Sequence, residues 1–343
     1  MLLRALSASF LLISAAAVHA DPPKVAADIA PVHSLVSRVM QGIAEPDLIL
    51  PLDASPHGYA MRPSEARALS EAELVIWIGE DLTPWFGRAI EAASEGKAAI
   101  ELLDIEGTNT LGFREGVLFE HDDHEDHAEK HDDHDHAEKH DDHDHGVSHD
   151  KHEDHDDHAH KHEDDDHEGH AHGDTDPHAW LDPENAALWT QAIAEKLAEL
   201  DPDNAQAYLS NASAARAELE ALETEISALI APAKGAKFVV FHDAYHYFEH
   251  HFGIEALGSI SIGDASAPSA ARLEEIQEII EHHKVKCVFA EPQMSARTID
   301  TVTEGLDVKV GELDPIGIDL APGPDFYPAL IRNIASSIAD CAK

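Results

Sequence analysis

Basic residues are scarce in this chain of 343 residues, which has 23 Lys and Arg against 68 Asp and Glu. The formal net charge is −45 at pH 7. Proteins that bind nucleic acid or an anionic membrane surface do so through clustered Lys and Arg. The composition therefore argues against both kinds of partner.

Long hydrophobic runs are absent after the first twenty residues, so we expect no insertion into a membrane. Those first residues, 1–20, combine Arg4, an apolar run too short to span a bilayer comfortably, and small residues before Asp21. This pattern is typical of a secretory signal peptide that is cleaved after Ala20. No cysteine follows it as a lipid attachment point, and we expect a soluble, exported protein.

Cysteine is rare as well, because only Cys287 and Cys341 occur. Neither belongs to a CxxC motif, which argues against zinc bound by thiolates. An even number of cysteines in an oxidising compartment favours a disulfide. Two free thiols are the alternative interpretation.

Short apolar runs alternate with stretches of helical period, a pattern that predicts an α/β fold with parallel sheets covered on both faces. The predicted strands are 25–30, 47–50, 74–79 and 98–103 in a first lobe, and 237–242, 254–262, 286–291 and 308–314 in a second lobe. Each lobe thus has a four-stranded parallel sheet flanked by helices. Ligands of such folds bind at the carboxyl ends of the strands, and a cleft between two lobes is a natural place for a site.

One segment, 203–232, has helical composition without Gly or Pro until Pro232, and predicts a long rigid helix that joins the lobes. The expected domain organisation follows from this helix. It comprises a signal peptide over 1–20, an N-terminal lobe over 21–200, the connecting helix over 203–232 and a C-terminal lobe over 236–343.

Residues 120–173 interrupt the first lobe with an insert made almost entirely of His, Asp and Glu. The insert has too few aliphatic residues to form a core, so we expect it to be disordered without metal. Imidazoles and carboxylates together suit a borderline transition metal. Because a flexible loop must become ordered around each ion, we expect weak, rapidly exchanging Zn²⁺ sites there. A solubility segment and a pH-responsive charge buffer are the alternatives.

A selective metal site needs ligands on rigid elements. The histidines outside the signal and the insert are His33, His57, His178, His242, His246, His250, His251, His282 and His283. Three of them lie where a site can form: His57 in the loop after a strand, His178 before a capped helix, and His242 at a strand end. Asp314 also ends a strand. We expect these four residues, two from each lobe, to converge on one interlobe site.

Several motifs occur in order along nearly the whole chain after the signal: ADIAPVHSLV, SPHGYAMRPSEA, DPHAWLDP, FHDAYHYFE, CVFAEPQ and GELDPIG. Together they resemble the zinc-binding periplasmic component of an ABC importer, the ZnuA-like branch of the cluster A-I (cluster 9) metal-binding proteins. The resemblance implies two α/β lobes joined by a long helix, with Zn²⁺ between them. It implies His57, His178 and His242 as ligands, with Asp314 near the fourth position.

The resemblance also implies a disulfide between Cys287 and Cys341 and a location in the periplasm. It implies that a monomeric protein delivers zinc to a membrane permease, which a cytoplasmic ATPase drives. The chain departs from the family at two positions. Pro56 stands where some zinc members have Glu, and His246 replaces a Gly of the family pattern, which places a second histidine four residues after His242.

Other interpretations remain open from the sequence. A manganese or iron carrier of the same family would more often use additional carboxylates than three imidazoles. A periplasmic zinc buffer or metallochaperone would depend on the insert and not on the four scattered residues. A zinc hydrolase is not expected, because the chain has no HExxH motif and only Asp243 beside His242 as a general base.

Overall fold

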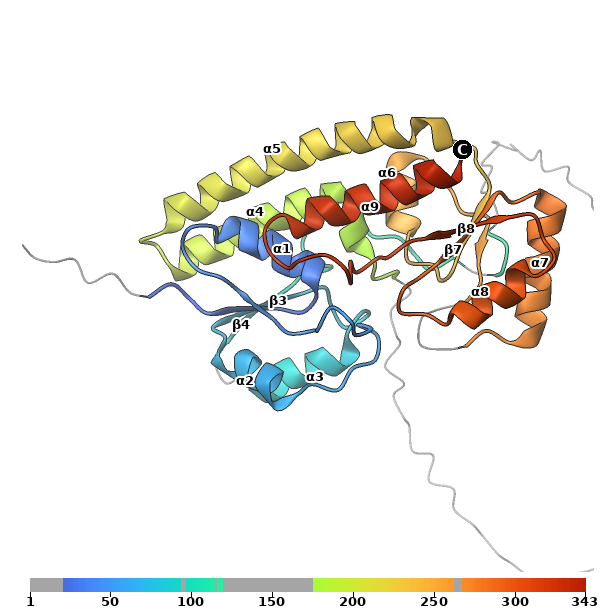
Figure 1. Cartoon of the computed structure of the whole chain (residues 1–343). Helices are drawn as coiled ribbons and strands as arrows, with labels where there is room; N and C mark the ends of the chain where they lie inside the picture. The colour runs from blue at the N-terminus through green and yellow to red at the C-terminus, as the bar shows by residue number, and fades with distance from the viewer. Residues whose placement is uncertain (1–20, 94–96, 115, 120–174, 262–266) are drawn as a thin grey trace, which may run out of the picture. The chain divides into compact units, whose positions relative to one another are not determined.

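Two parallel sheets form the framework of the described chain, which confirms the predicted α/β fold (Figure 1). The computed structural model describes residues 21–93, 97–114, 116–119, 175–261 and 267–343. The predicted signal peptide and the histidine-rich insert lie outside these residues. Both sheets belong to one compact unit of the chain, Met1–Phe119 together with Gly173–Lys343.

The first sheet has the strand order β2-β1-β3-β4, and neighbouring strands are parallel. Its strands are β1 (Val25–Ala27), β2 (Asp47–Leu48), β3 (Leu74–Trp77) and β4 (Ala98–Glu101). Successive residues face opposite sides, so that Val25 and Ile76 belong to one apolar cluster and Ala26 and Val75 to another. Helices must therefore cover both faces.

Four helices and one short 3₁₀ segment surround this sheet. They are α1 (Ala30–Val39), α2 (Pro63–Glu71), α3 (Pro84–Ala93), η1 (Ala179–Leu181) and α4 (Pro183–Leu200). The α-helices have proline within their first turn, where its fixed φ and missing N–H do no harm. The segment η1 leads into α4, which Asp182 caps by accepting a hydrogen bond from the Glu184 backbone N–H at 2.9 Å.

The second sheet repeats the arrangement with the order β6-β5-β7-β8. Its strands are β5 (Phe238–Val240), β6 (Gly258–Ser259), β7 (Cys287–Ala290) and β8 (Lys309–Glu312), and its helices α6 (His246–Phe252), α7 (Ala270–His283) and α8 (Ala296–Thr303). Val239 and Val288 face the helices α7 and α8. Phe238 and Phe289 face the opposite side, in the same apolar cluster as β1 and α4.

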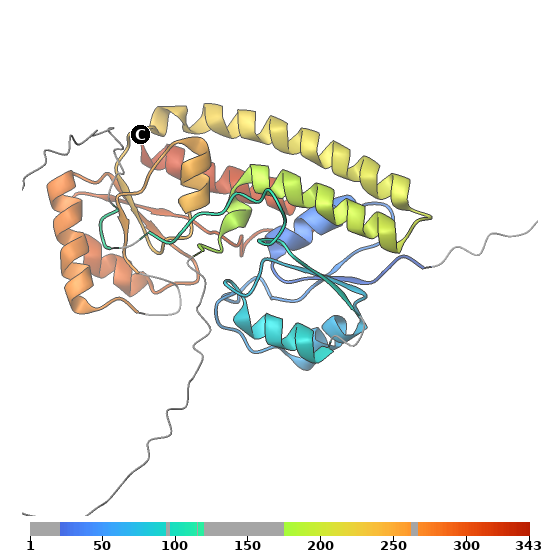
Figure 2. The ribbon, with the colours of Figure 1, turned by 180° about the vertical axis from the view of Figure 1, so that it is seen from behind.

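The long helix α5 (Ala205–Ile230) joins the two lobes, as predicted, and continues into η2 (Ala231–Ala233). It does not cross open solvent, because it packs along α4 and along the C-terminal helix α9 (Phe326–Cys341), as Figures 1 and 2 show. Most of its buried residues, among them Tyr208 and Leu219, belong to the core cluster shared by both sheets. Among the described helices, α5 included, none is both long and apolar enough to cross a membrane.

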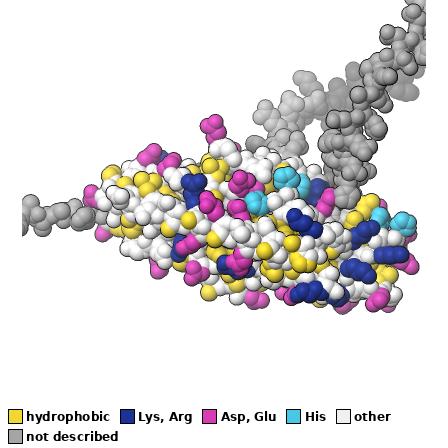
Figure 3. Space-filling model, turned by 90° about the horizontal axis from the view of Figure 1, so that it is seen from above, with side chains coloured by type: hydrophobic (Ala, Val, Ile, Leu, Met, Phe, Trp, Pro, Cys, Tyr) yellow, Lys and Arg dark blue, Asp and Glu magenta, His cyan; other side chains and the backbone are white. Residues whose placement is uncertain are grey.

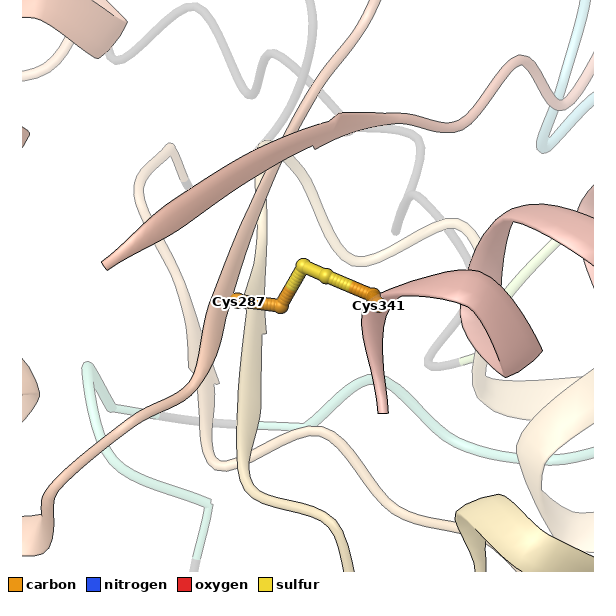
Figure 4. The surroundings of a disulfide bond; sticks show 2 residues. All are labelled: Cys287 and Cys341. Atoms are coloured by element: carbon orange, nitrogen blue, oxygen red, sulfur yellow. A yellow bond between two sulfur atoms is a disulfide. The ribbon is translucent and has the colours of Figure 1, made fainter. Parts of the chain in front are cut away.

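Cys287 and Cys341 form the predicted disulfide, with Cα atoms 5.8 Å apart (Figure 4). The bond joins β7 to the end of α9, two elements 54 residues apart in the sequence. In the chain-entropy model, closing a loop of this length stabilises the folded state by about 4 kcal/mol.

The segment after β4 runs from the first sheet to the edge of the second (Figure 2). There Leu118 forms an antiparallel bridge with Gly258, and the Phe119 N–H donates to the Leu257 carbonyl at 2.8 Å. A Cβ atom on Gly258 would lie 1.9 Å from the Val117 carbonyl oxygen, so only glycine permits this approach. The residues that precede the insert are thus attached to the C-terminal lobe.

One face of the molecule, above α5, is drawn with side chains coloured by type in Figure 3. Asp and Glu are spread along this face, whereas most of its Lys and Arg side chains gather toward the right-hand end.

Candidate metal centre

Three histidines from three separate segments converge in the described chain. One ring nitrogen each of His57, His178 and His242 lies within 4.8 Å of the other two. The ring centroid of His178 is 5.3 Å from that of His57 and 5.4 Å from that of His242. Zinc binds imidazole nitrogen at about 2.0–2.1 Å, so three ligand nitrogens around one ion must lie close together in this way.

The segment that carries His57 is the loop between β2 and α2. Ser55 Oγ accepts a hydrogen bond from the His57 N–H at 3.3 Å, and the Pro56 carbonyl accepts one from Trp85 Nε1 at 2.7 Å. Trp85 belongs to α3, so this bond ties the loop to the helix layer of the first lobe. His57 itself is half-buried.

His178 is buried just before η1, and Asp176 holds it at two points. Asp176 Oδ1 accepts hydrogen bonds from the His178 backbone N–H at 3.0 Å and from its Nδ1 at 2.7 Å. The carboxylate is 1% exposed, and this burial raises the pKa of Asp176 to about 7, against the opposing effect of the His178 N–H. Trp180 Nε1 donates to the Pro315 carbonyl at 2.9 Å and so ties η1 to the loop after β8.

His242 lies at the carboxyl end of β5, beside the end of the neighbouring strand β7. Both carboxylate oxygens of Glu291, which follows β7, lie 2.7 Å from His242 Nδ1. Oε1 of Glu291 also accepts a longer bond, 3.3 Å, from the His242 backbone N–H. Glu291 is 4% exposed, and water therefore competes little for its oxygens.

The carboxylates of Asp176 and Glu291 determine the tautomers of His178 and His242. When Nδ1 of His178 donates to Asp176 and Nδ1 of His242 donates to Glu291, each ring keeps its proton on Nδ1. Each ring then has its lone pair on Nε2, the nitrogen that would bind a cation, and the rings are fixed in orientation. A carboxylate, an imidazole and a metal in series is a common arrangement in zinc sites.

A small cavity of about 10 Å³ lies at the three imidazoles, which line it together with Trp180 and Glu291. About this volume is needed to hold a single water molecule. The space therefore fits one atom-sized ligand. Imidazole donors in a site of this size suit a borderline transition metal such as zinc.

Comparison with known proteins agrees with this chemistry. Residues 25–341 match the model of the family described as zinc-uptake complex component A, periplasmic. The chain belongs to this family. A high-affinity zinc uptake system protein ZnuA of Brucella abortus is 44% identical over 92% of this chain and 91% of its own length. The protein of the same description from Paracoccus denitrificans is 42% identical over 94% and 92%. A crystal structure of ZnuA covers 94% of this chain and 100% of its own chain, with a TM-score of 0.70 at 22% identity.

Asp314, which was predicted to lie near the fourth ligand position, is in the loop after β8. Among the described residues, its carboxylate is not part of the group formed by His57, His178 and His242. Its Oδ1 accepts hydrogen bonds from the Ile316 and Gly317 N–H groups at 3.0 and 2.9 Å. Its Oδ2 accepts one from the Ile318 N–H at 2.6 Å. The carboxylate therefore shapes its own loop in this structure.

His246, the extra histidine of this chain, begins α6 and does not join the three imidazoles in the described group of ligand atoms. Its Nδ1 lies 3.9 Å from Asp176 Oδ2, beyond hydrogen-bonding distance. Burial, together with the positive charge of Arg114, lowers the pKa of His246.

Sequence reasoning missed the two carboxylates that hold the histidines. Asp176 stands two residues before His178 in the motif DPHAW, a spacing that permits its side chain to bond to the histidine. Glu291 ends a strand as His242 does, but only the pairing of β5 with β7 brings them together. Arg114 was missed as well. Its guanidinium forms an ion pair with Asp243 and another with Glu249, whose Oε2 lies 2.7 Å from Arg114 Nη1.

Proposed function

We propose that this protein binds Zn²⁺ between its two lobes through His57, His178 and His242, and delivers it to a membrane permease of an ABC importer. The observation that supports this most strongly is the convergence of three imidazoles, two of them with Nδ1 bonded to a buried carboxylate. Membership of a periplasmic zinc-uptake family supports the same function, and such a component is a binding protein and not an enzyme.

Asp314 is proposed as the residue nearest the fourth coordination position. The Trp180 bond to Pro315 and the cavity lining by Pro315 and Ile316 support a place for its loop beside the histidines. To bind the ion itself, the carboxylate must reach it with an oxygen that already accepts a backbone hydrogen bond, since both Oδ1 and Oδ2 do so. Three nitrogens and one oxygen favour zinc over manganese and iron, whose sites more often use additional carboxylates.

The histidine-rich insert, 120–173, is proposed to hold further Zn²⁺ ions weakly and to raise the zinc concentration near the lobes. Its C-terminal end adjoins a described residue that contacts the site. Asp176, just after it, bonds to His178, and Phe119, just before it, bonds to the edge of the second sheet. The exported protein is proposed to act in the periplasm as a monomer, with the permease and its ATPase as partners.

A zinc titration against a competing chelator tests the site. The chain is compared with and without residues 120–172, and each form with and without His57→Ala. We expect the shortened chain to keep one tight site and His57→Ala to abolish it. His283→Ala is the control, because this residue ends α7 on the far side of the second sheet and leaves the site intact.

The same titration separates the rival functions. If tight binding disappears with the insert alone, the protein is a zinc buffer and the assignment of the three histidines is wrong. If the shortened chain prefers Mn²⁺ over Zn²⁺ under matched conditions, the carrier belongs to the manganese or iron class.

A further inference from the structure

A second group of ligand-type side chains lies outside the three-histidine site. Asp182 and Glu184, at the start of α4, each place a carboxylate oxygen within 4.8 Å of a ring nitrogen of His251 on α6. The closest pair is His251 Nδ1 and Asp182 Oδ1, at 2.8 Å. We call Asp182, Glu184 and His251 the α4–α6 cluster.

The α4–α6 cluster carries more negative charge than its one imidazole can neutralise. A third carboxylate, that of Glu223 on α5, is near enough for the cluster to act on its pKa. Burial raises the pKa of Glu223, the charge of His251 opposes this, and Glu184 and Asp182 raise the pKa further. No Lys or Arg of the described residues forms an ion pair with any of these three carboxylates.

Two buried acidic residues near the cluster, unlike those of the cluster, form ion pairs with an arginine. Asp243 and Glu249, also near α6, are both neutralised by the guanidinium of Arg114. Buried carboxylates without such a partner are costly unless a cation compensates them. In the α4–α6 cluster no Lys or Arg does this, and the imidazole of His251 pairs with the one buried carboxylate, that of Asp182, at 2.8 Å. Against the lowering effect of burial, this bond raises the pKa of His251, and against the raising effect of burial it lowers the pKa of Asp182.

A metal ion can reach the α4–α6 cluster from solvent. The Asp182 side chain is 1% exposed, that of His251 is 16% exposed, and Glu184 is exposed. The cluster thus has a buried carboxylate at its base and an open side at Glu184. Asn109 Nδ2 donates to Asp182 Oδ2 at 3.1 Å, and the Glu184 N–H donates to Oδ1, so the carboxylate at the base is held in place.

We propose that the α4–α6 cluster is a second Zn²⁺ site, with His251, Asp182 and Glu184 as ligands and Glu223 as a neighbouring compensating charge. An imidazole with carboxylates is a zinc donor set. On binding, the ion takes the place of the proton shared by His251 Nδ1 and Asp182 Oδ1, and this proton goes to solvent. The two atoms then separate by a few tenths of an ångström to accept an ion at about 2.0–2.2 Å from each.

The second site is close in the sequence to the first site but shares no ligand with it. Asp182 is four residues after His178 in the sequence, and His251 lies on the helix that follows His242. A metal bound at the α4–α6 cluster would fasten α6 to the start of α4, the two elements that follow these two histidines. A bound ion there would thus help to keep His178 and His242 in their relative positions.

Anomalous diffraction tests the proposal on the complete protein. Crystals are soaked with several equivalents of Zn²⁺ at about pH 7.5, and anomalous difference maps are measured on both sides of the zinc absorption edge. We expect one peak at His57, His178 and His242 and a separate peak bonded to His251 and Asp182. The first peak is an internal control, so that failure of one site is distinguishable from failure of the other.

Three variants sharpen the test. His251→Gln removes the imidazole, and Asp182→Asn removes the charge but leaves an oxygen that can still cap α4. Both should lose the second peak and keep the first. His250→Gln, which changes the exposed neighbour of His251 on the same helix, should keep both peaks.

Two results would overturn the proposal. One is a fully occupied first peak with no density at the α4–α6 cluster in the unaltered protein. The other is a peak near α6 that persists in both His251→Gln and Asp182→Asn. If a variant fails to fold, the bond distances in the unaltered protein decide. A peak that is farther than about 2.5 Å from both ring nitrogens of His251 is not a zinc ion coordinated by this residue.

Discussion

Asp176 and Glu291 show how single residues prepare the site for a cation. Each accepts the Nδ1 proton of one histidine at 2.7 Å and is itself buried. The rings therefore meet an incoming ion with their Nε2 lone pairs already oriented, and little rotational entropy is lost on binding.

The substitution Glu291→Gln tests this role. It keeps the size of the side chain but removes the charge that polarises His242, and loss of such a partner typically weakens metal binding about 10-fold to 100-fold. We expect this loss of zinc affinity in chelator competition with the chain lacking 120–172, while the fold is retained. Glu304→Gln, at the exposed end of α8, is the matched control. Equal affinity for both variants would show that Glu291 has no part in binding.

Acidification should release zinc from the three histidines. An imidazole in water has a pKa of about 6.5, and only its neutral form binds metal. Protons therefore compete with zinc more strongly as the pH falls from about 7.5 to 5. We expect zinc affinity of the shortened chain to fall across this range, measured by competition with a chelator whose own pH dependence is known. A constant affinity would contradict a site made of three imidazoles.

The ligand-type histidines could be predicted from the sequence because each follows a strand or precedes a capped helix, where parallel sheets place their ligands. The carboxylates could not be predicted as readily. Glu291 meets His242 only because β5 and β7 are neighbours in the sheet order, although the strands are separated by β6 in the sequence.

At the scale of elements, Arg114 connects the segment before the insert to α6. Its guanidinium forms ion pairs with Asp243, next to His242, and with Glu249 of α6. The guanidinium also lies 3.9 Å from the centre of the Phe119 ring. Because the Phe119 N–H donates to the Leu257 carbonyl, the segment is held at both ends. The position of His242 thus depends on residues far away in the sequence.

Arg114→Met should destabilise the protein strongly, because it leaves two buried carboxylates without a cation. Breaking a buried ion pair in this way costs about 3–5 kcal/mol of unfolding free energy. Denaturant unfolding measures the loss. The control is Arg332→Met, which breaks an exposed pair with Glu225 and should cost less than about 1 kcal/mol. Similar losses in both variants would contradict the role of Arg114.

The strands could be predicted from apolar periodicity because both faces of each sheet are covered. The segment 111–119 could not, since its contacts depend on the edge of a distant sheet and on the missing side chain of Gly258. Nothing in its local pattern marks it as part of the second lobe.

At the scale of the whole molecule, one apolar cluster runs through both sheets and includes buried residues of α1, α4, α5 and α9. A shared core resists a wide rotation of one lobe against the other. We expect the solution scattering curves of the zinc-loaded and zinc-free chain lacking 120–172 to superimpose at low angles. A clear decrease in the radius of gyration on loading would contradict a rigid connection.

The most direct test of the account is X-ray absorption spectroscopy at the zinc edge, on the chain lacking 120–172 loaded with one equivalent of Zn²⁺. The account predicts a first shell of nitrogen and oxygen at about 2.0–2.1 Å, with the multiple scattering of three imidazole rings. His178→Ala should reduce the count to two. A shell made of oxygen with one imidazole or none would contradict the claim that the three histidines are the zinc ligands.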